Sequence, residues 1–243
     1  MIPRKGDYGF DAPYVPISMV VGALPLLAGA VSGALRGEPV AALTMGVSGT
    51  FLLASAGSYL YTTRAGKLRA WDEILGGLAL AGDERVLDLG CGRGAVLLLA
   101  AQRLSTGRAV GVDLWSAADQ SGNALETTRR NAALEGVADR IDLHTGDMRE
   151  LPFPDGSFAV VVSSLAIHNI PDAEGRARAV REAARVLEPG GRILLADFRF
   201  TDAYADEMRK AGLADVARRG LGARFWYGGP WAATHVVTAR KPA

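Results

Sequence analysis

An apolar segment runs directly into three alternating glycines between residues 86 and 94, in the sequence VLDLGCGRG. Residues 86–89 predict a buried strand, and the apolar residues from Ala95 onward predict a helix. Gly90, Gly92 and Gly94 allow backbone angles that other residues avoid, and they leave room for a ligand to approach the main chain. The sequence therefore predicts a strand, a glycine turn and a helix, an arrangement typical of nucleotide-binding sites.

The glycine turn by itself does not identify the nucleotide. Gly90, Gly92 and Ala95 satisfy the G-x-G-x-x-G/A pattern of dinucleotide-binding proteins. Asp113 ends a second predicted strand, RAVGVD, where a carboxylate accepts hydrogen bonds from the ribose hydroxyls of several cofactors. An NAD-linked oxidoreductase is therefore one alternative at this point.

Motifs further along the chain distinguish between these cofactors. A third predicted strand, IDLHTGD, ends in Asp147 and Met148; a fourth, FAVVVSS, leads into LAIHNI; a fifth, RILLADF, follows the sequence LEPGG at 187–191. With these motifs, residues 68–241 resemble the class I S-adenosylmethionine (SAM)-dependent methyltransferases. The joint occurrence of D-x-G-x-G-x-G, Asp113, G-D-M and L-x-P-G-G is far more specific than any one motif. The resemblance implies SAM as cofactor and makes the oxidoreductase a distant alternative.

Helical and strand signals alternate along this region. Strands are expected near residues 85, 109, 141, 158 and 192, and helices at 66–80, 95–104, 122–134, 173–187 and 203–211. This alternation predicts an α/β fold, with a mostly parallel, doubly wound, Rossmann-like sheet covered by helices on both faces. Two last strand signals, 215–219 and 234–239, correspond in the resembling family to an antiparallel hairpin at the sheet edge, which brings the sheet to seven strands.

The resemblance also assigns cofactor-binding residues. The three glycines approach the cofactor, and the other residues, taken from the ends of four strands, are Asp88 for the methionine amino group, Asp113 for the ribose, Asp147 and Met148 for the adenine, and Ser164 near the methionine part. Leu114 and Trp115 either cover an adenine face or, for Trp115, pack in the core. Asp88 can instead cap the glycine turn, and Asp147 can belong to a simple turn.

Methyl transfer requires alignment of the acceptor with the methyl group and exclusion of water more than acid or base chemistry. His168 is the candidate base, because it follows the fourth strand and an imidazole titrates near neutrality. A packing or hydrogen-bonding role is the alternative for His168. Tyr204 and Tyr227 are further polar candidates, and Tyr227 is included with His168 as a catalytic candidate.

Residues 224–231, RFWYGGPW, place several aromatic side chains in a connection between edge strands. This segment either forms an apolar lid over the acceptor, dips toward a bilayer, or packs as the core of the hairpin. A lid of this kind predicts a lipophilic or small apolar acceptor: a lipid amine, a quinone-like phenol or a thiol.

The first 63 residues differ in character from the rest. Residues 15–35 and 39–63 contain no charged side chain, and each run reaches the ~20 residues that a bilayer-spanning helix needs. The sequence therefore predicts a membrane hairpin at 1–63 and a methyltransferase domain at 64–243. Arg4 and Lys5 precede the first run, and Arg64, Lys67 and Arg69 follow the second, so the positive-inside rule places the catalytic domain in the cytoplasm. Two buried helices of a soluble protein are the alternative.

Small residues recur at four-residue spacing in both runs: Gly29, Gly33 and Gly37 in the first, and Ala42, Gly46, Thr50, Ala54 and Ser58 in the second. Such faces are typical of close helix packing in membranes and are candidates for homo-oligomer contacts. Lys67 and Arg64 either contact lipid headgroups or hold the cofactor carboxylate.

Composition limits the remaining possibilities. The net charge of +1 on 243 residues predicts no nucleic-acid partner. A single cysteine, Cys91, and three scattered histidines predict a site without metal. The function predicted from the sequence is a membrane-anchored SAM-dependent methyltransferase, and the alternative from another class is a noncatalytic SAM-binding or scaffold protein.

Overall fold

The computed structural model describes residues 4–116 and 122–243. These residues form two compact units. The sheet unit contains the described residues up to Gly9 and those within Leu68–Leu221 and Thr234–Ala243, and the helix-pair unit contains Phe10–Lys67 and Gly222–Ala233. The predicted boundary at residue 63 lies close to the end of the helix pair. The structure in addition groups the N-terminal tail with the sheet, and residues 222–233 with the helices.

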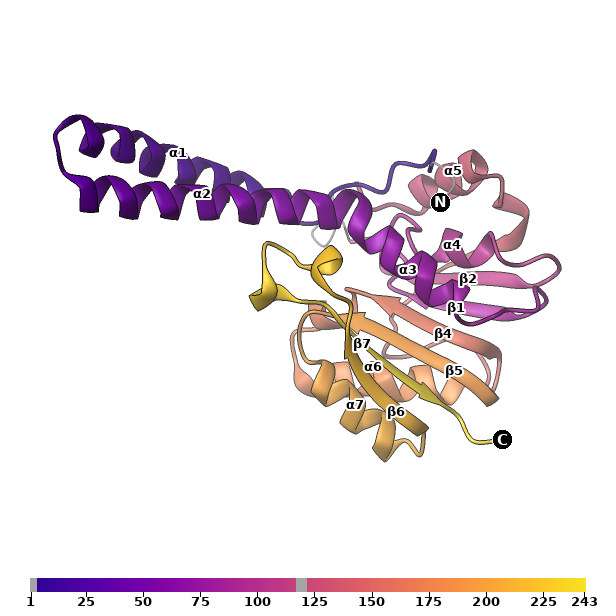
Figure 1. The fold of residues 1–243 in the computed structure, drawn as a ribbon. Coiled ribbons are helices and arrows are strands. Elements are labelled where there is room, and N and C mark those ends of the chain that lie inside the picture. Colours follow the sequence, from indigo (N-terminus) through magenta and orange to yellow (C-terminus); the bar gives the residue numbers. More distant parts are fainter. Residues whose placement is uncertain (1–3, 117–121) are drawn as a thin grey trace. The chain divides into compact units, whose positions relative to one another are not determined.

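The sheet unit is built on seven strands in the order β3-β2-β1-β4-β5-β7-β6 (Figure 1). Strands β1 to β5 are parallel, whereas β7 runs antiparallel to both β5 and β6. The strands are β1 Arg85–Leu89, β2 Arg108–Asp113, β3 Ile141–Thr145, β4 Phe158–Ser164, β5 Leu187–Asp197, β6 Ala214–Gly220 and β7 His235–Arg240. This is the predicted mostly parallel sheet with an antiparallel edge hairpin.

The helices of this unit lie before β1 and between later strands, as the alternating pattern predicts. They are α3 Lys67–Gly76, of which Lys67 is grouped with the helix pair, α4 Leu97–Ala101, α5 Leu125–Glu135, α6 Ala173–Val186 and α7 Thr201–Lys210. Local signals explain some of their ends. The Asp172 side chain accepts a hydrogen bond from the Gly175 amide at 2.6 Å and so caps the start of α6, while Gly136 ends α5 in the left-handed conformation.

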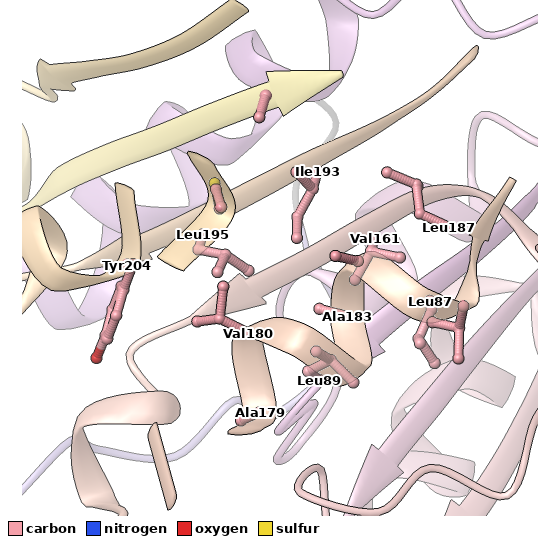
Figure 2. Packing of buried hydrophobic residues seen from close by; sticks show 14 of the residues in the cluster. Leu87, Leu89, Val161, Ala179, Val180, Ala183, Leu187, Ile193, Leu195 and Tyr204 are labelled. Atoms are coloured by element: carbon pink, nitrogen blue, oxygen red, sulfur yellow. The ribbon is translucent and has the colours of Figure 1, made fainter. Parts of the chain in front are cut away.

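One face of the sheet packs against α6 and α7. Leu87, Val161 and Ile193 are neighbours across β1, β4 and β5, and all three are fully buried. Figure 2 shows them beside Val180 and Ala183 of α6. Side chains alternate between the faces of a strand, so the residues between them point to the opposite face. Asp88 therefore lies on the face away from this core.

On that opposite face, α4 lies close to β2. A side-chain carbon placed on Gly111 would lie 2.7 Å from the Cys91 sulfur and 2.9 Å from Leu97, so these side chains would have to shift to accommodate a residue other than glycine. The close contact holds the segment after β1 against the sheet. It thereby positions the turn between β1 and α4.

Strand β5 differs from its prediction, because it begins at Leu187 and includes the sequence expected as a preceding turn. The pairing with β4 shifts register between Phe158 and Val160. Gly190 is in the left-handed region, and its amide donates a hydrogen bond to the Lys241 carbonyl, in the segment after β7, at 2.9 Å. The residues expected as a turn are thus part of an irregular strand, because the C-terminal segment supplies hydrogen-bond partners for them.

The helix-pair unit contains α1 Tyr14–Leu35 and α2 Pro39–Tyr61, connected by a tight turn in which Gly37 has a φ of +71° (Figure 1). Small residues allow the two helices to approach. A side-chain carbon on Gly33 would lie 3.1 Å from the Ala42 amide nitrogen, and one on Gly49 would lie 2.8 Å from Leu27. Gly33 and Ala42 belong to the predicted small-residue faces, whereas Gly49 was not predicted.

Both helices are long and apolar enough to cross a membrane. Few residues of their apolar stretches are buried, 11 % in α1 and 17 % in the stretch that includes α2. Large apolar side chains such as Val21, Leu24 and Leu43 are at least 60 % exposed. A groove of about 1010 Å³ along the pair is lined by other members of the small-residue faces, among them Gly46, Thr50 and Ala54.

A short π-helix, η1 Thr62–Gly66, follows α2 and contacts residues 224–226. A side-chain carbon on Gly66 would lie 1.7 Å from the Arg224 carbonyl oxygen, so this backbone contact depends on glycine. The Thr62 hydroxyl donates a hydrogen bond to the Trp226 carbonyl at 2.7 Å. These contacts explain why residues 222–233 are grouped with the helix pair.

Candidate active site

The glycine turn directly follows β1, and each of its three predicted glycines adopts a backbone conformation that favours glycine. Gly90, Gly92 and Gly94 all have φ values between +51° and +86°. The constraint is strongest at Gly90, where a side-chain carbon would lie 2.2 Å from the Ala166 side chain and 3.2 Å from Met148. The turn after β1, the segment after β4 and Met148 therefore meet at one place beside the carboxyl ends of the strands.

Asp88, within β1, is the buried acid beneath this turn. Its side chain is 1 % exposed, and neither carboxylate oxygen has a hydrogen-bond partner among the described residues. Burial raises the pKa of Asp88 from its usual value to about 7; the Leu97 backbone amide opposes this rise, and the nearby Asp113 charge adds to it. A buried acid without a partner fits the positively charged amino group of an amino-acid ligand. The alternative of Asp88 as a cap for the glycine turn is not supported by any hydrogen bond from the turn residues.

Asp113, at the end of β2, does hold the glycine turn. One of its oxygens accepts a hydrogen bond from the Gly92 amide at 2.8 Å, and the other accepts from the Trp115 amide at 2.6 Å and from the Asn123 side chain at 3.2 Å. A carboxylate has about four acceptor positions, so three hydrogen bonds leave capacity for a ribose hydroxyl. In the sequence, residues 119–123 are either a cap for the following helix or a segment over the cofactor edge; Asn123 belongs to this segment, and residues 119–121, which include the cap candidates Asp119 and Ser121, lie outside the described part of the chain.

Leu114 and Trp115 follow Asp113 at the surface. Leu114 is 62 % exposed, and Trp115 is half-buried, with its indole nitrogen donating to the Thr145 hydroxyl at 2.9 Å. Trp115 also has a φ of +57°, an uncommon conformation for a tryptophan. Neither side chain belongs to the buried core, so both are available to a ligand at this edge.

Asp147 is engaged by a neighbour of its own segment. Its carboxylate accepts hydrogen bonds from the Arg149 guanidinium at 2.6–3.0 Å, and this interaction lowers the pKa of Asp147. The ion pair is partly exposed, so a ligand amino group can compete with Arg149. Its role toward adenine stays a prediction.

Ser164, at the end of β4, is fixed by a residue that the sequence did not reveal. Its hydroxyl accepts a hydrogen bond from the indole nitrogen of Trp71 at 2.8 Å, and Trp71, in α3, is 1 % exposed. The adjacent Ser163 hydroxyl donates to the Leu89 carbonyl at 2.8 Å. Both hydrogen bonds hold the end of β4 beside the glycine turn.

A second polar cluster lies where β4 and β5 end. His168 belongs to a short 3₁₀-helix, η3 Ile167–Asn169, and its Nδ1 lies 2.9 Å from Oδ1 of Asp197. Asp197 is 2 % exposed and also accepts hydrogen bonds from the Phe198 amide at 2.8 Å and the Tyr204 hydroxyl at 3.3 Å. Burial raises the pKa of Tyr204 above its usual value, so its hydroxyl stays protonated as a donor.

This cluster gives the imidazole of His168 a defined orientation. An ionised Asp197 requires the proton of a neutral imidazole on Nδ1, which leaves a lone pair on Nε2. The His168 side chain remains 17 % exposed, and its ring packs against the edge of Phe198 at 4.7 Å. Ala166 contacts Gly90 in the glycine turn, and His168 follows Ala166 by two residues. The cluster therefore begins next to the segment that contacts the turn. The arrangement suits a base beside a cofactor.

Asp197 was not predicted, although the sequence held the signal for it. It ends the apolar strand RILLADF in the same manner as Asp113 ends RAVGVD. A strand-end acid in a parallel sheet lies at the edge where ligands bind.

Tyr227 lies in the helix-pair unit, where its hydroxyl donates to Asp11 at 2.8 Å and its ring packs edge-on against Tyr59. Lys67, 5 % exposed, binds the same carboxylate at 2.6 and 2.9 Å, so its charge is directed to Asp11. Phe225 is fully buried, whereas Trp231 is 60 % exposed beside Phe51 of α2. These contacts favour packing of the aromatic segment with the helices, and its role as a lid, with Tyr227 as a catalytic residue, stays a prediction.

Among residues 4–116 and 122–243 no group of three His, Cys, Asp or Glu side chains is arranged to hold a metal ion. Cys91 is buried in the glycine turn, and burial raises the pKa of its thiol. This thiol is therefore protonated at neutral pH and is not a nucleophile.

Comparisons with known proteins agree with this geometry. Residues 86–191 match the family model described as a methyltransferase domain. A 27-O-demethylrifamycin SV methyltransferase from Amycolatopsis mediterranei is 36 % identical over 155 residues, which are 61 % of this chain and 53 % of that protein. A demethylmenaquinone methyltransferase from Symbiobacterium thermophilum is 38 % identical over 112 residues, which are 46 % of this chain and 41 % of that protein. The chain thus spans about half the length of these curated relatives.

Solved structures agree on the fold. A structure of geranyl diphosphate methyltransferase in complex with SAM matches with a TM-score of 0.57 and 18 % identity, over 72 % of this chain and 85 % of that one. Together these comparisons support a class I SAM-dependent methyltransferase: residues 86–191 match the methyltransferase domain, and the sheet unit has the fold of a methyltransferase solved with SAM. The NAD-linked alternative is therefore abandoned.

Proposed function

We propose that this chain is a membrane-anchored SAM-dependent methyltransferase that methylates a hydroxyl group of a lipophilic acceptor of the quinone-like phenol kind. The observation that carries the proposal is the buried contact between His168 and Asp197 beside the glycine turn. A phenol and a thiol must both lose a proton as they become nucleophiles, and the phenol gains more from an oriented base than a thiol because its pKa, about 10, is higher than the thiol value of about 8.5.

The residues of the site have distinct tasks in this reaction. SAM, when bound, supplies an electrophilic methyl group. Asp88 holds the positively charged amino group of the ligand, and Asp113 accepts from its ribose while keeping the Gly92 amide in place. Nε2 of His168 accepts the hydroxyl proton of the acceptor, and Asp197 stabilises the resulting imidazolium through Nδ1. Neutral Tyr204 donates to Asp197 and fixes its orientation.

Two observations support a lipophilic acceptor. The relatives include proteins named for methylating demethylmenaquinone and 27-O-demethylrifamycin SV. In addition, Tyr227 and Trp231 pack against aromatic side chains of α2 in the same unit, so this part of the chain combines aromatic and apolar surfaces. Both features fit an acceptor that partitions into a membrane.

Membrane anchoring is supported by the helix pair itself. The helices expose large apolar side chains along most of their length, and few residues of their apolar stretches are buried. Burying a Leu or Val side chain is worth roughly 1.5–3 kcal/mol, so a surface of this kind is stabilised by lipid. The basic residues outside both ends support a cytoplasmic orientation of the sheet unit under the positive-inside rule. Self-association through the small-residue groove of the pair stays a prediction.

The test uses the full chain in membranes and a panel of acceptors: a long-chain phenol, thiol and amine, each with labelled SAM. Methylation of the phenol is expected, and His168→Ala should reduce its rate by about 10²–10⁴-fold, with partial recovery at high pH where phenols ionise unaided. His144→Ala is the matched control, because His144 is exposed on β3. A loss no greater than that of the control would contradict the assignment of His168 as the base.

Two further outcomes bear on the alternatives. Binding of SAM without turnover of any acceptor in the panel would favour the noncatalytic SAM-binding alternative. Release of the chain from membranes by high salt without detergent would contradict the anchor and favour two buried helices of a soluble protein.

A further inference from the structure

One face of α5 carries three polar side chains that are buried. Thr128 and Asn131 are fully buried, and the side chain of Glu135 is 3 % exposed. Their spacing of three and four residues places them on the same side of the helix. Buried polar groups need hydrogen-bond partners, and most of those on this face come from two segments, the glycine turn and the N-terminal tail, which we define as residues 4–9. Gln102, after α4, adds one hydrogen bond to Oε2 of Glu135 at 3.3 Å.

Toward the glycine turn, this face of α5 binds two successive carbonyl groups. The Thr128 hydroxyl donates to the Gly92 carbonyl at 2.7 Å, and the Asn131 side-chain amide donates to the Arg93 carbonyl at 2.9 Å. The Gly92 amide is in turn bound by Asp113. The conformation of the turn at the cofactor site is therefore set by side chains of α5 and β2.

Toward the N-terminal tail, Asn131 pairs with the backbone of Asp7 through both of its polar atoms. Its amide donates to the Asp7 carbonyl at 2.8 Å, and its oxygen accepts from the Asp7 amide at 3.0 Å. The Asp7 carboxylate forms an ion pair with the Arg93 guanidinium at 2.7 Å. Arg93 is 7 % exposed, so a buried arginine of the glycine turn is paired with the tail.

Glu135 binds the tail at a second point. Its Oε1 accepts hydrogen bonds from the amides of Lys5 and Gly6, both at 2.9 Å, and from the Tyr8 hydroxyl at 2.8 Å. These bonds and the nearby Arg4 lower the pKa of Glu135, so the carboxylate is ionised at neutral pH. Tyr8 is itself buried. The tail is thus bound along its length and not at one residue.

Asn131 is the link between the two segments, because one side-chain amide serves both. Its donors reach the tail and the glycine turn together, so displacement of the tail leaves a fully buried amide without part of its hydrogen bonding. An unsatisfied buried polar group is costly, so loss of the tail favours states in which water replaces it at Asn131 or the turn moves. Docking of the tail on α5 and the conformation of the glycine turn are therefore coupled.

We propose that the N-terminal tail is part of the cofactor site, and that Asn131 and Asp7 are positioning residues which hold the glycine turn in its SAM-binding conformation. The first apolar helix begins only five residues after the tail ends, at Tyr14. The same short segment that orders the turn is thus joined directly to α1. This inference rests on SAM as the cofactor and is independent of the acceptor.

The first test measures binding of S-adenosylhomocysteine to the full chain in detergent by calorimetry, without any acceptor. Asn131→Asp preserves the shape of the side chain but removes the donors to both segments. Its affinity should fall about fivefold or more, the usual lower range of coupling between two linked sites. Glu126→Gln is the matched control, since Glu126 is exposed on α5 and pairs only locally with Arg129 among the described contacts.

The second test uses the reciprocity of coupling, which a purely structural contact would not produce. If the tail strengthens cofactor binding, then the cofactor must strengthen docking of the tail. Saturating S-adenosylhomocysteine should slow tryptic cleavage after Lys5 severalfold in the unmodified chain, and it should have little effect in Asn131→Asp. If Asn131→Asp fails to fold, Asp7→Asn, which changes an exposed side chain, is tested in the same two measurements.

Equal affinity of Asn131→Asp and Glu126→Gln for S-adenosylhomocysteine would overturn the proposal. Cleavage after Lys5 that is equally fast with and without S-adenosylhomocysteine in the unmodified chain would do the same. Neither measurement involves methyl transfer, so a failure of the proposed acceptor chemistry would leave both results intact and interpretable.

Discussion

The buried acid Asp88 makes the stability of the ligand-free protein depend on pH in an unusual direction. The folded state raises its pKa from 3.8 to about 7, because burial disfavours the charged carboxylate. Between these values the folded protein keeps a proton that the unfolded chain has lost. The stabilisation that this proton contributes is therefore fully present below about pH 4, decreases as the pH rises, and is lost above pH 7.

The size of the effect follows from the two pKa values. A difference of about three corresponds to about 4 kcal/mol of stability lost between pH 4 and pH 8. Asp88→Asn keeps the shape of the side chain and cannot ionise, so this loss should disappear in the variant. At pH 8 the variant should therefore be more stable than the unmodified chain. This gain is reduced by about 1–3 kcal/mol, because the buried amide of the asparagine also lacks hydrogen-bond partners.

Urea unfolding of the ligand-free chain at pH 4 to 8 measures this dependence, with Asp83→Asn as control, since Asp83 is exposed just before β1. Ligand binding should show the converse behaviour. Ionised Asp88 is needed to hold a positively charged amino group, so binding of S-adenosylhomocysteine near pH 6 should release about one proton, and the affinity should level off above pH 7. Calorimetry in buffers of different ionisation enthalpy detects the proton.

Two results would refute this reasoning. The first is an equal pH dependence of stability in the unmodified chain and in Asp88→Asn, which would show that the acid is not protonated in the folded protein. The second is unchanged ligand affinity in Asp88→Asn at pH 8, which would remove Asp88 from the amino-group site.

Two further predictions concern glycines. Gly90→Ala should destabilise the sheet unit by about 2 kcal/mol or more and weaken binding of S-adenosylhomocysteine, because the new carbon meets Ala166 at 2.2 Å; thermal melts and calorimetry measure both, and wild-type values would contradict the close approach of the two segments. Gly33→Leu should loosen the helix pair, since its side chain would meet the Ala42 backbone at 3.1 Å, whereas Gly57→Leu has nothing within 4 Å. We expect Gly33→Leu, and not Gly57→Leu, to lower the stability of the helix pair in detergent, and equal stability of the two variants would refute the close packing.

Features carried by neighbouring residues were visible in the sequence. The glycine turn at 90–94, Asp88 within the strand before it and the acid Asp113 at the next strand end are local patterns, and the structure brings them together as the parallel sheet requires. The seven-stranded sheet followed from the alternation of strands and helices together with the family resemblance. The length of the two uncharged runs likewise predicted α1 and α2.

Features that join distant segments were decided only by the tertiary structure. Asp197 ends its strand with the same signal as Asp113, yet its contact with His168 depends on how the segments after β4 and β5 cross. The contact of the N-terminal tail with Asn131 spans more than a hundred residues, and nothing in either segment alone indicates the other. The pattern of apolar residues reports which side of an element is buried, whereas a hydrogen bond between polar side chains depends on where two elements meet. For this protein, the sequence by itself predicted the sheet fold and proposed the cofactor residues, and the tertiary structure decided which groups orient the candidate base and which hold the glycine turn.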